Sequence, residues 1–416
     1  MATLVLNASQ LLTLAGSEGP RAGREKGSLS LFRDGAVLIE AGLVVTAGPR
    51  ELVLSHPLAK GAARVSAEGR VVTPGFIDAH THPVFSAARL DDFEARSGGA
   101  SYQDLAARGG GILWTVNGVR GASEAELVAG LRRRVRDFLA CGTTTIEAKS
   151  GYGLDLGNEL KMLRVLKTVG AQESLEIVAT LLAAHAVPPE MKGRKSEYVG
   201  RICSEMIPRA AAEGLARFVD LFCEAGYFDL ADLEKIAEAA AAAGLGLKVH
   251  SEQLSRMGSL ALAVSRKAVS VDHLDCAVEE DFSALAASGT IACLVPGSNY
   301  FLGKPYPPAR RLLDAGASVA LATDFNPGTC PCWDLRAVLS IACTQMKMTP
   351  AEAMVAATIN GAHAAGLGKT HGCLEPGKVA DLVCHDAEDW REIAYYFAGP
   401  RVRWTMKRGE VVFKSS

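Results

Sequence analysis

Two histidines stand one residue apart at the end of an apolar run, in the segment FIDAHTHPVF at residues 76–85. Because alternate residues of a β-strand point to the same side, His80 and His82 are expected to face one way from a strand end. Neutral imidazoles are common ligands of divalent metal ions. The pair therefore indicates a metal site, which needs further ligands from elsewhere in the chain.

Other ionisable residues follow apolar, strand-like runs in the same way. His250 and Glu252 close the run GLKVHSE, His273 closes AVSVDHLD, and Asp324 closes ASVALATDF. A single histidine at such a place is usually a hydrogen-bonded core residue, but five of the nine histidines follow strand-like runs. Three histidines and one carboxylate suit zinc or a similar ion that keeps one position open for water.

These residues need a scaffold that brings distant strand ends together. Eight strand-like runs alternate with stretches of helical periodicity over roughly 270 residues, and a (β/α)8 barrel typically has ~250. The runs are GFIDAHTH, GTTTIEAKS, EIVATLLAAH, ARFVDLFCE, GLKVHSE, AVSVDHLD, TIACLVPGS and ASVALATDF. In such a barrel all strand ends meet on one face, where active sites of this fold lie. A doubly wound open sheet is disfavoured, because G-x-G-x-x-G follows none of the runs.

Both ends of the chain differ in sequence pattern from the alternating strands and helices of the middle. Short Val-rich runs separated by glycine-containing turns occupy the first part and return near the end, in KVADLVCHD and VRWTMKRGEVVFK. We predict that residues 1–73 and 375–416 form one composite small β-sandwich domain. Residues 74–374 are expected to form the (β/α)8, TIM-like barrel, which makes the fold class α/β.

The composition argues against nucleic-acid and membrane partners. Hydrophobic residues make up 49% of the 416 residues and the formal net charge is −2, while no apolar stretch is long enough to span a bilayer. The apolar start lacks a basic n-region, and the ten cysteines are scattered, which predicts a cytoplasmic protein with reduced thiols. Cys330 and Cys332 are interpreted as packed loop thiols, because no second pair has zinc-site spacing.

Longer motifs add a resemblance to a known family. The histidines and the aspartate resemble the metal set of the amidohydrolase superfamily. Within it, PGFIDAHTHPVF, GTTTIEAKSGYGL, AAHAVP, HSEQ and TDFNPGT are similar to the imidazolonepropionases of histidine degradation. The resemblance covers nearly the whole chain, and AKSGYGL together with DFNPGT is its most specific part. It implies metal-dependent hydrolysis of the cyclic amide C–N bond of the small-molecule substrate 4-imidazolone-5-propanoate, giving N-formimidoyl-L-glutamate.

The resemblance also implies roles for individual residues. One divalent or trivalent ion per chain, zinc or iron, is implied with the ligands His80, His82, His250 and Asp324. Two-metal relatives use a lysine at the end of the fourth strand, whereas FVDLFCE ends in Glu224, which favours a single ion. Substrate contacts are implied at Arg89, Tyr152, His185, Gln253, Asn326, Gly328 and Thr329. We also expect a homodimer.

The chemistry of the residues suggests catalytic roles. His273 and His185 follow strands at places where a donor to a developing oxyanion is needed. Glu252, two positions from His250 and so on the same strand side, and Asp324 are alternative carriers of a proton to the leaving ring nitrogen. Glu252 has the further alternative of supporting His250 only. Arg89, in the loop after the first strand, is expected to hold the propanoate tail by two parallel hydrogen bonds.

Two other functions stay open at this point. A cyclic-amidine deaminase of the guanine or cytosine type, from the same superfamily, would share the metal residues but would not need Arg89 or the AKSGYGL loop. A catalytically inactive structural relative should have lost metal ligands, and this chain retains all of them. Tyr102 is a weaker candidate for the substrate site.

Overall fold

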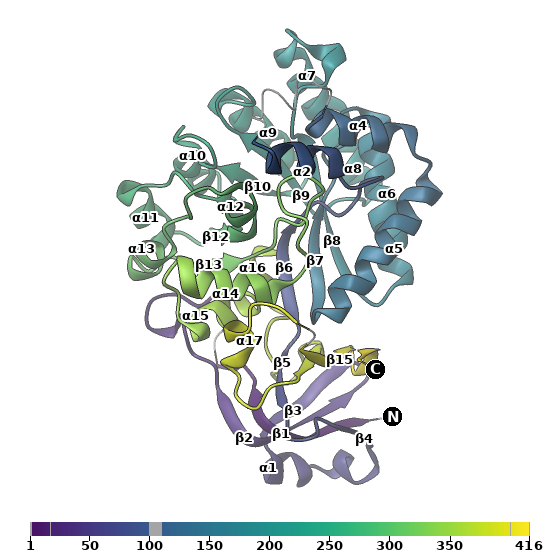
Figure 1. Cartoon of the computed structure of the whole chain (residues 1–416), viewed down its shortest axis with the longest axis vertical. Coiled ribbons are helices and arrows are strands. Elements are labelled where there is room, and N and C mark those ends of the chain that lie inside the picture. Colours follow the sequence, from purple (N-terminus) through teal and green to yellow (C-terminus); the bar gives the residue numbers. More distant parts are fainter. Residues whose placement is uncertain (1, 17, 100–109, 400, 416) are drawn as a thin grey trace.

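The computed structural model describes residues 2–16, 18–99, 110–399 and 401–415. Figure 1 shows a barrel of strands wrapped by helices, with a smaller β-domain at one end. The first and last parts of the chain lie together in that domain, and both termini are found there. The predicted α/β fold, a barrel with a small β domain built from both ends of the chain, is confirmed.

Eight parallel strands form the barrel in sequence order, each hydrogen-bonded to the next. They are β6 (Phe76–Thr81), β7 (Thr143–Lys149), β8 (Glu176–Ala184), β9 (Phe218–Cys223), β10 (Gly246–Ser251), β11 (Ser270–His273), β12 (Ile291–Leu294) and β13 (Val319–Leu321). The first strand and the segment after the last one close the ring. His82 N donates to Phe325 O at 2.8 Å, and Asp324 N donates to His80 O at 3.0 Å. All eight predicted strands form in the predicted order.

Helices connect consecutive strands and cover the outside of the barrel (Figure 1). From β6 to β10 they are α2 (Leu90–Ser97), α4 (Ile112–Gly121), α5 (Glu124–Ala140), α6 (Leu156–Gln172), the short helix Pro189–Met191, α7 (Lys195–Arg201), a π-helical turn at Ile202–Met206, α8 (Ile207–Ala212) and α9 (Leu230–Ala242). After β10 they are α10 (Ser259–Ser265), α11 (Glu279–Ala286), α12 (Pro296–Leu302), α13 (Ala309–Asp314), α14 (Leu335–Gln345), α15 (Pro350–Ala356) and α16 (Ile359–Ala364). Within the described ranges, no helix is both long and apolar enough to cross a membrane.

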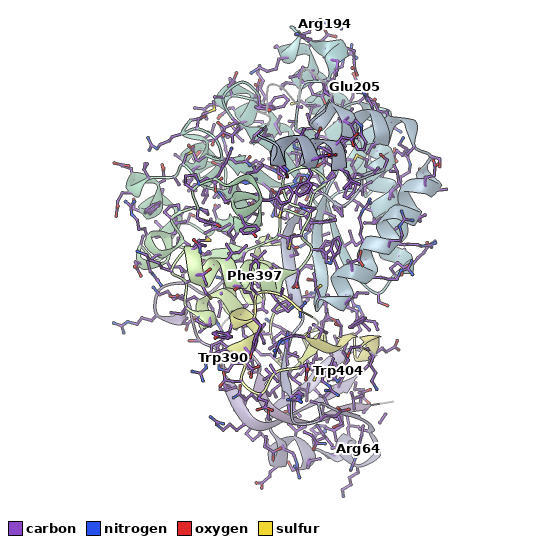
Figure 2. All side chains as sticks on the ribbon, in the orientation of Figure 1. Arg64, Arg194, Glu205, Trp390, Phe397 and Trp404 are labelled. Carbon is purple, nitrogen blue, oxygen red and sulfur yellow. The ribbon has the colours of Figure 1, made fainter. Side chains whose placement is uncertain are left out.

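The small domain draws strands from both ends of the chain. They are β1 (Thr3–Leu12), β2 (Leu31–Glu40), β3 (Leu43–Pro49), β4 (Ala63–Ser66), β5 (Val71–Pro74), β14 (Leu382–His385), β15 (Val402–Lys407) and β16 (Glu410–Lys414), with short helices at Gly23–Glu25, α1 (Arg50–Leu54), Pro57–Gly61 and α17 (Glu392–Tyr395). Antiparallel pairing of β14 with β5 joins the two halves. We predicted a β-sandwich for this domain. In the structure, its strands are hydrogen-bonded into one continuous mixed sheet that branches at β1. Trp404 of β15, labelled in Figure 2, is buried and its Nε1 donates to Ser66 O at 3.4 Å.

The barrel strands separate apolar from polar residues by simple alternation. On β9, Val219 and Leu221 belong to the apolar core that packs under the helices. Asp220, between them, reaches Lys149 of β7 and His250 of β10 in the barrel interior. The outer layer thus supplies hydrophobic stability, and the interior is free to hold ionisable groups that lead up to the strand ends.

A buried carboxylate fastens the seam of the barrel, which gives a stability prediction. Asp78 of β6 accepts hydrogen bonds from Thr323 N at 3.0 Å and Thr323 Oγ1 at 2.6 Å. Asp78→Ala leaves two buried donors unpaired, at about 1–3 kcal/mol each, so calorimetry should show a melting temperature several degrees lower. Asp78→Asn keeps an acceptor oxygen and should lose less. Equal melting of Asp78→Ala and the unaltered protein would show that this pair does not hold the seam.

Candidate metal centre and substrate cavity

The C-terminal ends of the barrel strands surround one cavity of about 460 Å³. That volume lies within the ~300–1,000 Å³ range of small-molecule sites. Its lining includes the predicted site residues His82, Arg89, Tyr152, His185, His250, Gln253, His273, Asp324, Asn326, Gly328 and Thr329. These residues end or follow six different barrel strands and therefore meet as the barrel geometry requires. The predicted residues His80 and Glu252 are absent from the described lining.

Three imidazoles gather at the floor of this cavity. Ring nitrogens of His80, His82 and His250 all lie within 4.8 Å of one another. Asp324 Oδ1 lies 3.5 Å from His82 Nε2 and 3.7 Å from His80 Nε2. All four side chains are buried. The structure brings the four predicted ligands together, and the group of imidazoles is compatible with a single metal ion.

Two buried aspartates orient two of these imidazoles. Asp272 Oδ2 lies 2.5 Å from His80 Nδ1, and Asp220 Oδ1 lies 3.1 Å from His250 Nδ1. With Nδ1 engaged, each ring has Nε2 left for an ion. Burial, and after it the Lys149 ammonium, lowers the pKa of His80 well below its usual value. His80 is therefore neutral near pH 7, which is the form that binds metals.

Other ring nitrogens in the cluster lack partners. His82 Nδ1 and His273 Nδ1 are buried and make no hydrogen bond within the described part of the chain. The His273 ring lies 5.3 Å from that of His80 and 5.2 Å from that of His250, between ring centroids. Buried polar atoms without partners are costly unless an ion, water or ligand satisfies them. The donor set and its unsatisfied nitrogens thus fit a metal ion with a polar ligand beside it.

The strand ends at this face have unusual backbone geometry. His273 has φ 77°, Asp324 has φ 55° and Glu252 has φ 53°. Left-handed φ values are uncommon for residues other than glycine and concentrate at functional sites. These three residues end or follow β10, β11 and β13, so the chain turns sharply where the predicted chemistry lies.

Glu252 departs from the position expected for a proton carrier. Its carboxylate accepts from Met257 N at 2.8 Å and Ser259 Oγ at 3.0 Å, and it is absent from the described lining of the cavity. The expectation assumed that residues two apart share one side of a strand. β10 ends at Ser251, and the left-handed turn at Glu252 breaks that alternation. The carboxylate therefore fastens the loop that leads into α10.

A buried side chain that the sequence did not single out shapes one loop of the cavity. The fully buried Glu159 of α6 accepts from Gly151 N at 3.0 Å, Gly153 N at 2.8 Å and Leu154 N at 2.8 Å. This carboxylate holds the loop that presents Tyr152, whose pKa is raised by burial, so the phenol remains a donor. An acidic residue shortly after a glycine-rich loop, at the start of a helix, is the available sequence signal.

A similar clamp holds the loop after β13. Asn326 Oδ1 accepts from Gly328 N at 2.8 Å and Thr329 N at 2.7 Å, and its Nδ2 donates to Asp324 O at 2.7 Å. The amide is thus occupied within the loop. Asn326 shapes the cavity wall chiefly by fixing the backbone of Gly328 and Thr329.

Arg89 lies against that loop. Its Nε donates to Thr115 Oγ1 at 2.7 Å, and its guanidinium lies next to Gly328. A Cβ at position 328 would lie 2.2 Å from Arg89 Nη1, so a larger residue there would displace the guanidinium from its present place. Arg96, which sequence reasoning missed, also lines the cavity and donates to Gly328 O at 3.3 Å. Lys304 is a further cation of the lining that the sequence did not indicate.

The remaining predictions from the sequence concern two cysteines and one tyrosine. Cys330 is buried and both Cys330 and Cys332 are free thiols, as expected for packed loop cysteines. Tyr102 lies outside the described residues.

Comparisons with known proteins agree with this geometry. The model of the Amidohydrolase family matches residues 71–412. The chain is 43% identical to the imidazolonepropionase of Solibacter usitatus over 413 residues, covering 99% of each chain. It is 45% identical to the imidazolonepropionase of Geobacillus kaustophilus over 412 residues, covering 98% of this chain and 97% of the relative.

Solved structures share the fold at much lower identity. A zinc-bound adenosine deaminase from Xanthomonas campestris superposes with a TM-score of 0.74 at 18% identity, covering 98% of this chain and 92% of its own. A guanine deaminase from C. acetobutylicum gives a TM-score of 0.71 at 13% identity, covering 99% of this chain and all of its own. At these identities the likeness concerns the fold alone.

The clustered imidazoles predict a metal content. Protein purified without added metal should contain one divalent ion per chain by elemental analysis. His250→Ala should lose most of it, because one of three nitrogen ligands is removed, whereas exchange of the exposed Arg136 for alanine should leave the content unchanged. Two ions per chain, or full metal content in His250→Ala, would contradict the single site.

Proposed function

The chain belongs to the amidohydrolase family and, within it, to the imidazolonepropionases, and on that premise we propose that it hydrolyses 4-imidazolone-5-propanoate to N-formimidoyl-L-glutamate. Water adds to the ring carbonyl carbon, and the cyclic amide C–N bond breaks. The reaction belongs to histidine degradation. The proposed class is therefore a hydrolase acting on carbon–nitrogen bonds in cyclic amides.

One juxtaposition carries the proposal. A single cavity holds a buried cluster of metal-type ligands at its floor and the Arg89 guanidinium against Gly328 in its wall. The substrate has one group to match each of these: a ring amide for hydrolysis at the metal ligands, and a propanoate tail for the guanidinium. A guanidinium binds a carboxylate through two parallel hydrogen bonds. The cavity thus supports binding of the tail in the wall while the ring rests on the floor.

We assign the metal to His80, His82, His250 and Asp324, with zinc and iron as the two candidates. When bound, such an ion lowers the pKa of water and polarises a carbonyl oxygen. Asp324 lines the cavity and is proposed to take the proton from the attacking water and deliver it to the leaving ring nitrogen. Glu252, the other candidate from the sequence, is engaged within its own loop.

The remaining imidazoles have complementary tasks. His273 lines the cavity, and we propose that it donates a hydrogen bond to the oxygen that gains charge during attack. His185 stacks on His82, with ring centroids 5.3 Å apart, and its Nδ1 lies 3.0 Å from Gly151 O. That contact leaves His185 Nε2 for the substrate. Tyr152 and Gln253, both in the lining, are proposed as further polar contacts to the ring.

A deaminase, the rival stated from the sequence, is supported only by likeness in fold. Nothing in the cavity of a cyclic-amidine deaminase requires a carboxylate-binding guanidinium. The homodimer and the cytoplasmic location stay predictions, as do the domain boundaries at residues 73 and 375.

The activity itself is the first test. Purified protein should consume 4-imidazolone-5-propanoate, followed by loss of its ultraviolet absorbance, and yield N-formimidoyl-L-glutamate by mass spectrometry. His80→Ala and Asp324→Ala should abolish turnover while circular dichroism stays unchanged, because these residues lie on the catalytic face and not the stabilising face of the barrel. Near-normal turnover by either variant would refute the ligand assignment, and release of ammonia from guanine or cytosine would favour the deaminase.

Arg89 separates binding of the tail from the chemistry. Loss of one member of a charge-assisted pair costs about 2–5 kcal/mol when it is buried and less at a wet rim. Arg89→Ala should therefore lower kcat/KM at least about tenfold with unchanged metal content, and Arg89→Lys should restore only part. A substrate amidated at its tail should be poor for the unaltered enzyme and lose little more in Arg89→Ala. Equal impairment of the variant on charged and neutral tails would exclude the carboxylate role.

A further inference from the structure

A fully buried lysine lies beneath the imidazole cluster, and the proposed reaction gives it no task. Lys149, the last residue of β7, has no exposed surface. Its Nζ lies 2.8 Å from Asp220 Oδ2, 3.0 Å from Glu147 Oε2 and 3.6 Å from Asp272 Oδ2. These carboxylates come from β7, β9 and β11, so one ammonium ties three strands together inside the barrel.

Two of its partners are the aspartates that orient the imidazoles. Asp220 uses Oδ2 for Lys149 and Oδ1 for His250 Nδ1, and Oδ1 also accepts from His250 N at 3.2 Å. Asp272 Oδ2 contacts both Lys149 and His80 Nδ1. Lys149 is thus one carboxylate away from both rings.

The arrangement demands a cation at this point. Two desolvated carboxylates close together repel one another, and a buried charge without a partner is costly. Without the ammonium, Asp220 and Asp272 would have no shared partner and could turn away from the imidazoles. Lys149 attracts both carboxylates and keeps their oxygens aimed at the Nδ1 atoms of His250 and His80, which donate hydrogen bonds to them.

We propose that Lys149 is a positioning residue for the metal site: it holds Asp220 and Asp272 in place, so that His80 and His250 keep their protons on Nδ1 and present Nε2 to one ion. The inference rests on the proposed metal site and adds to it a residue that touches neither ion nor substrate. Groups that orient metal-binding histidines typically change affinity about 10- to 100-fold when removed.

The molecule contains a matched control. Lys248 of β10 is also fully buried, but its Nζ donates to the carbonyl oxygens of Ala79 and Ala364, at 3.3 and 3.1 Å. Both lysines therefore carry a buried charge inside the same barrel. Among the described residues Lys149 forms the ion pairs with Asp220 and Asp272, whereas Lys248 attracts Asp272 without an ion pair. Lys248→Met tests what loss of a buried lysine does in general.

The test is Co²⁺ binding to the whole chain after removal of its metal, by competition with a chelator, together with the visible spectrum of the Co²⁺ protein. Lys149→Met should bind Co²⁺ about 10- to 100-fold more weakly and with altered ligand-field bands. Lys248→Met should stay within about threefold of the unaltered protein, with the same spectrum. In the Asp220→Asn background, the further loss on removing Lys149 should be smaller, because part of its target is gone.

Further variants and measurements distinguish an effect on the metal site from misfolding and from failure of the proposed function. If Lys149→Met does not fold, Lys149→Met combined with Glu147→Gln removes one charge of each sign and should show the same weakening. Affinity within twofold of the unaltered protein, with an unchanged spectrum, in whichever variant folds would overturn the proposal, as would equal weakening in Lys248→Met. Failure of the unaltered protein to open 4-imidazolone-5-propanoate, with the Lys149 effect on Co²⁺ intact, would reject the proposed function alone.

Discussion

The centre of this molecule depends on keeping imidazoles neutral, buried and correctly turned. A buried histidine keeps one orientation and tautomer when the protein satisfies one ring nitrogen and leaves the other for a ligand. Asp272 and Asp220 do this for His80 and His250. The barrel makes both pairings possible, because Asp220 on β9 lies beside His250 on β10, and Asp272 on β11 reaches His80 on β6 across the barrel interior. The apolar layer under the helices can then carry stability while the interior holds charge.

A second constraint acts on the loops around the cavity. A loop that must keep a fixed shape needs partners for its backbone N–H groups, and buried acceptors supply them here. Glu159 serves the loop of Tyr152, Asn326 serves the loop of Gly328, and Glu252 serves the loop after β10. Each acceptor sits in or beside the loop that it holds. The cavity wall is therefore built mostly from local contacts, whereas its floor is built from contacts across strands.

This difference explains what could be predicted from the sequence. Strand alternation placed His80 and His82 together, and strand ends placed His250, His273 and Asp324 on the same face, since both rules need only local pattern and barrel topology. The same rule failed at Glu252, where the chain leaves the strand in a left-handed turn. Asp220 and Asp272 were not recognised, because an acidic residue inside a strand gains meaning only when its partner on another strand is known. Lys149 closes the run GTTTIEAKS, but the sequence does not show which carboxylates it meets across the barrel. Arg96 and Lys304 come from connecting segments, whose path the pattern does not determine.

Substrate specificity depends on the residues of the cavity wall and not on the barrel fold itself. Proteins named as adenosine deaminase and guanine deaminase share the fold at 18% and 13% identity, so the scaffold admits different substrates. Here position 328 must be glycine for Arg89 to rest where it does, and Arg96 donates to the carbonyl of the same residue. The close fit places a partly buried guanidinium in the cavity wall. In the proposed role of Arg89, a ligand without an anionic group would cover this cation without pairing it, which costs binding energy even where shape allows entry. The proposed selection for a carboxylate tail therefore includes rejection of neutral rings as well as attraction of the correct substrate.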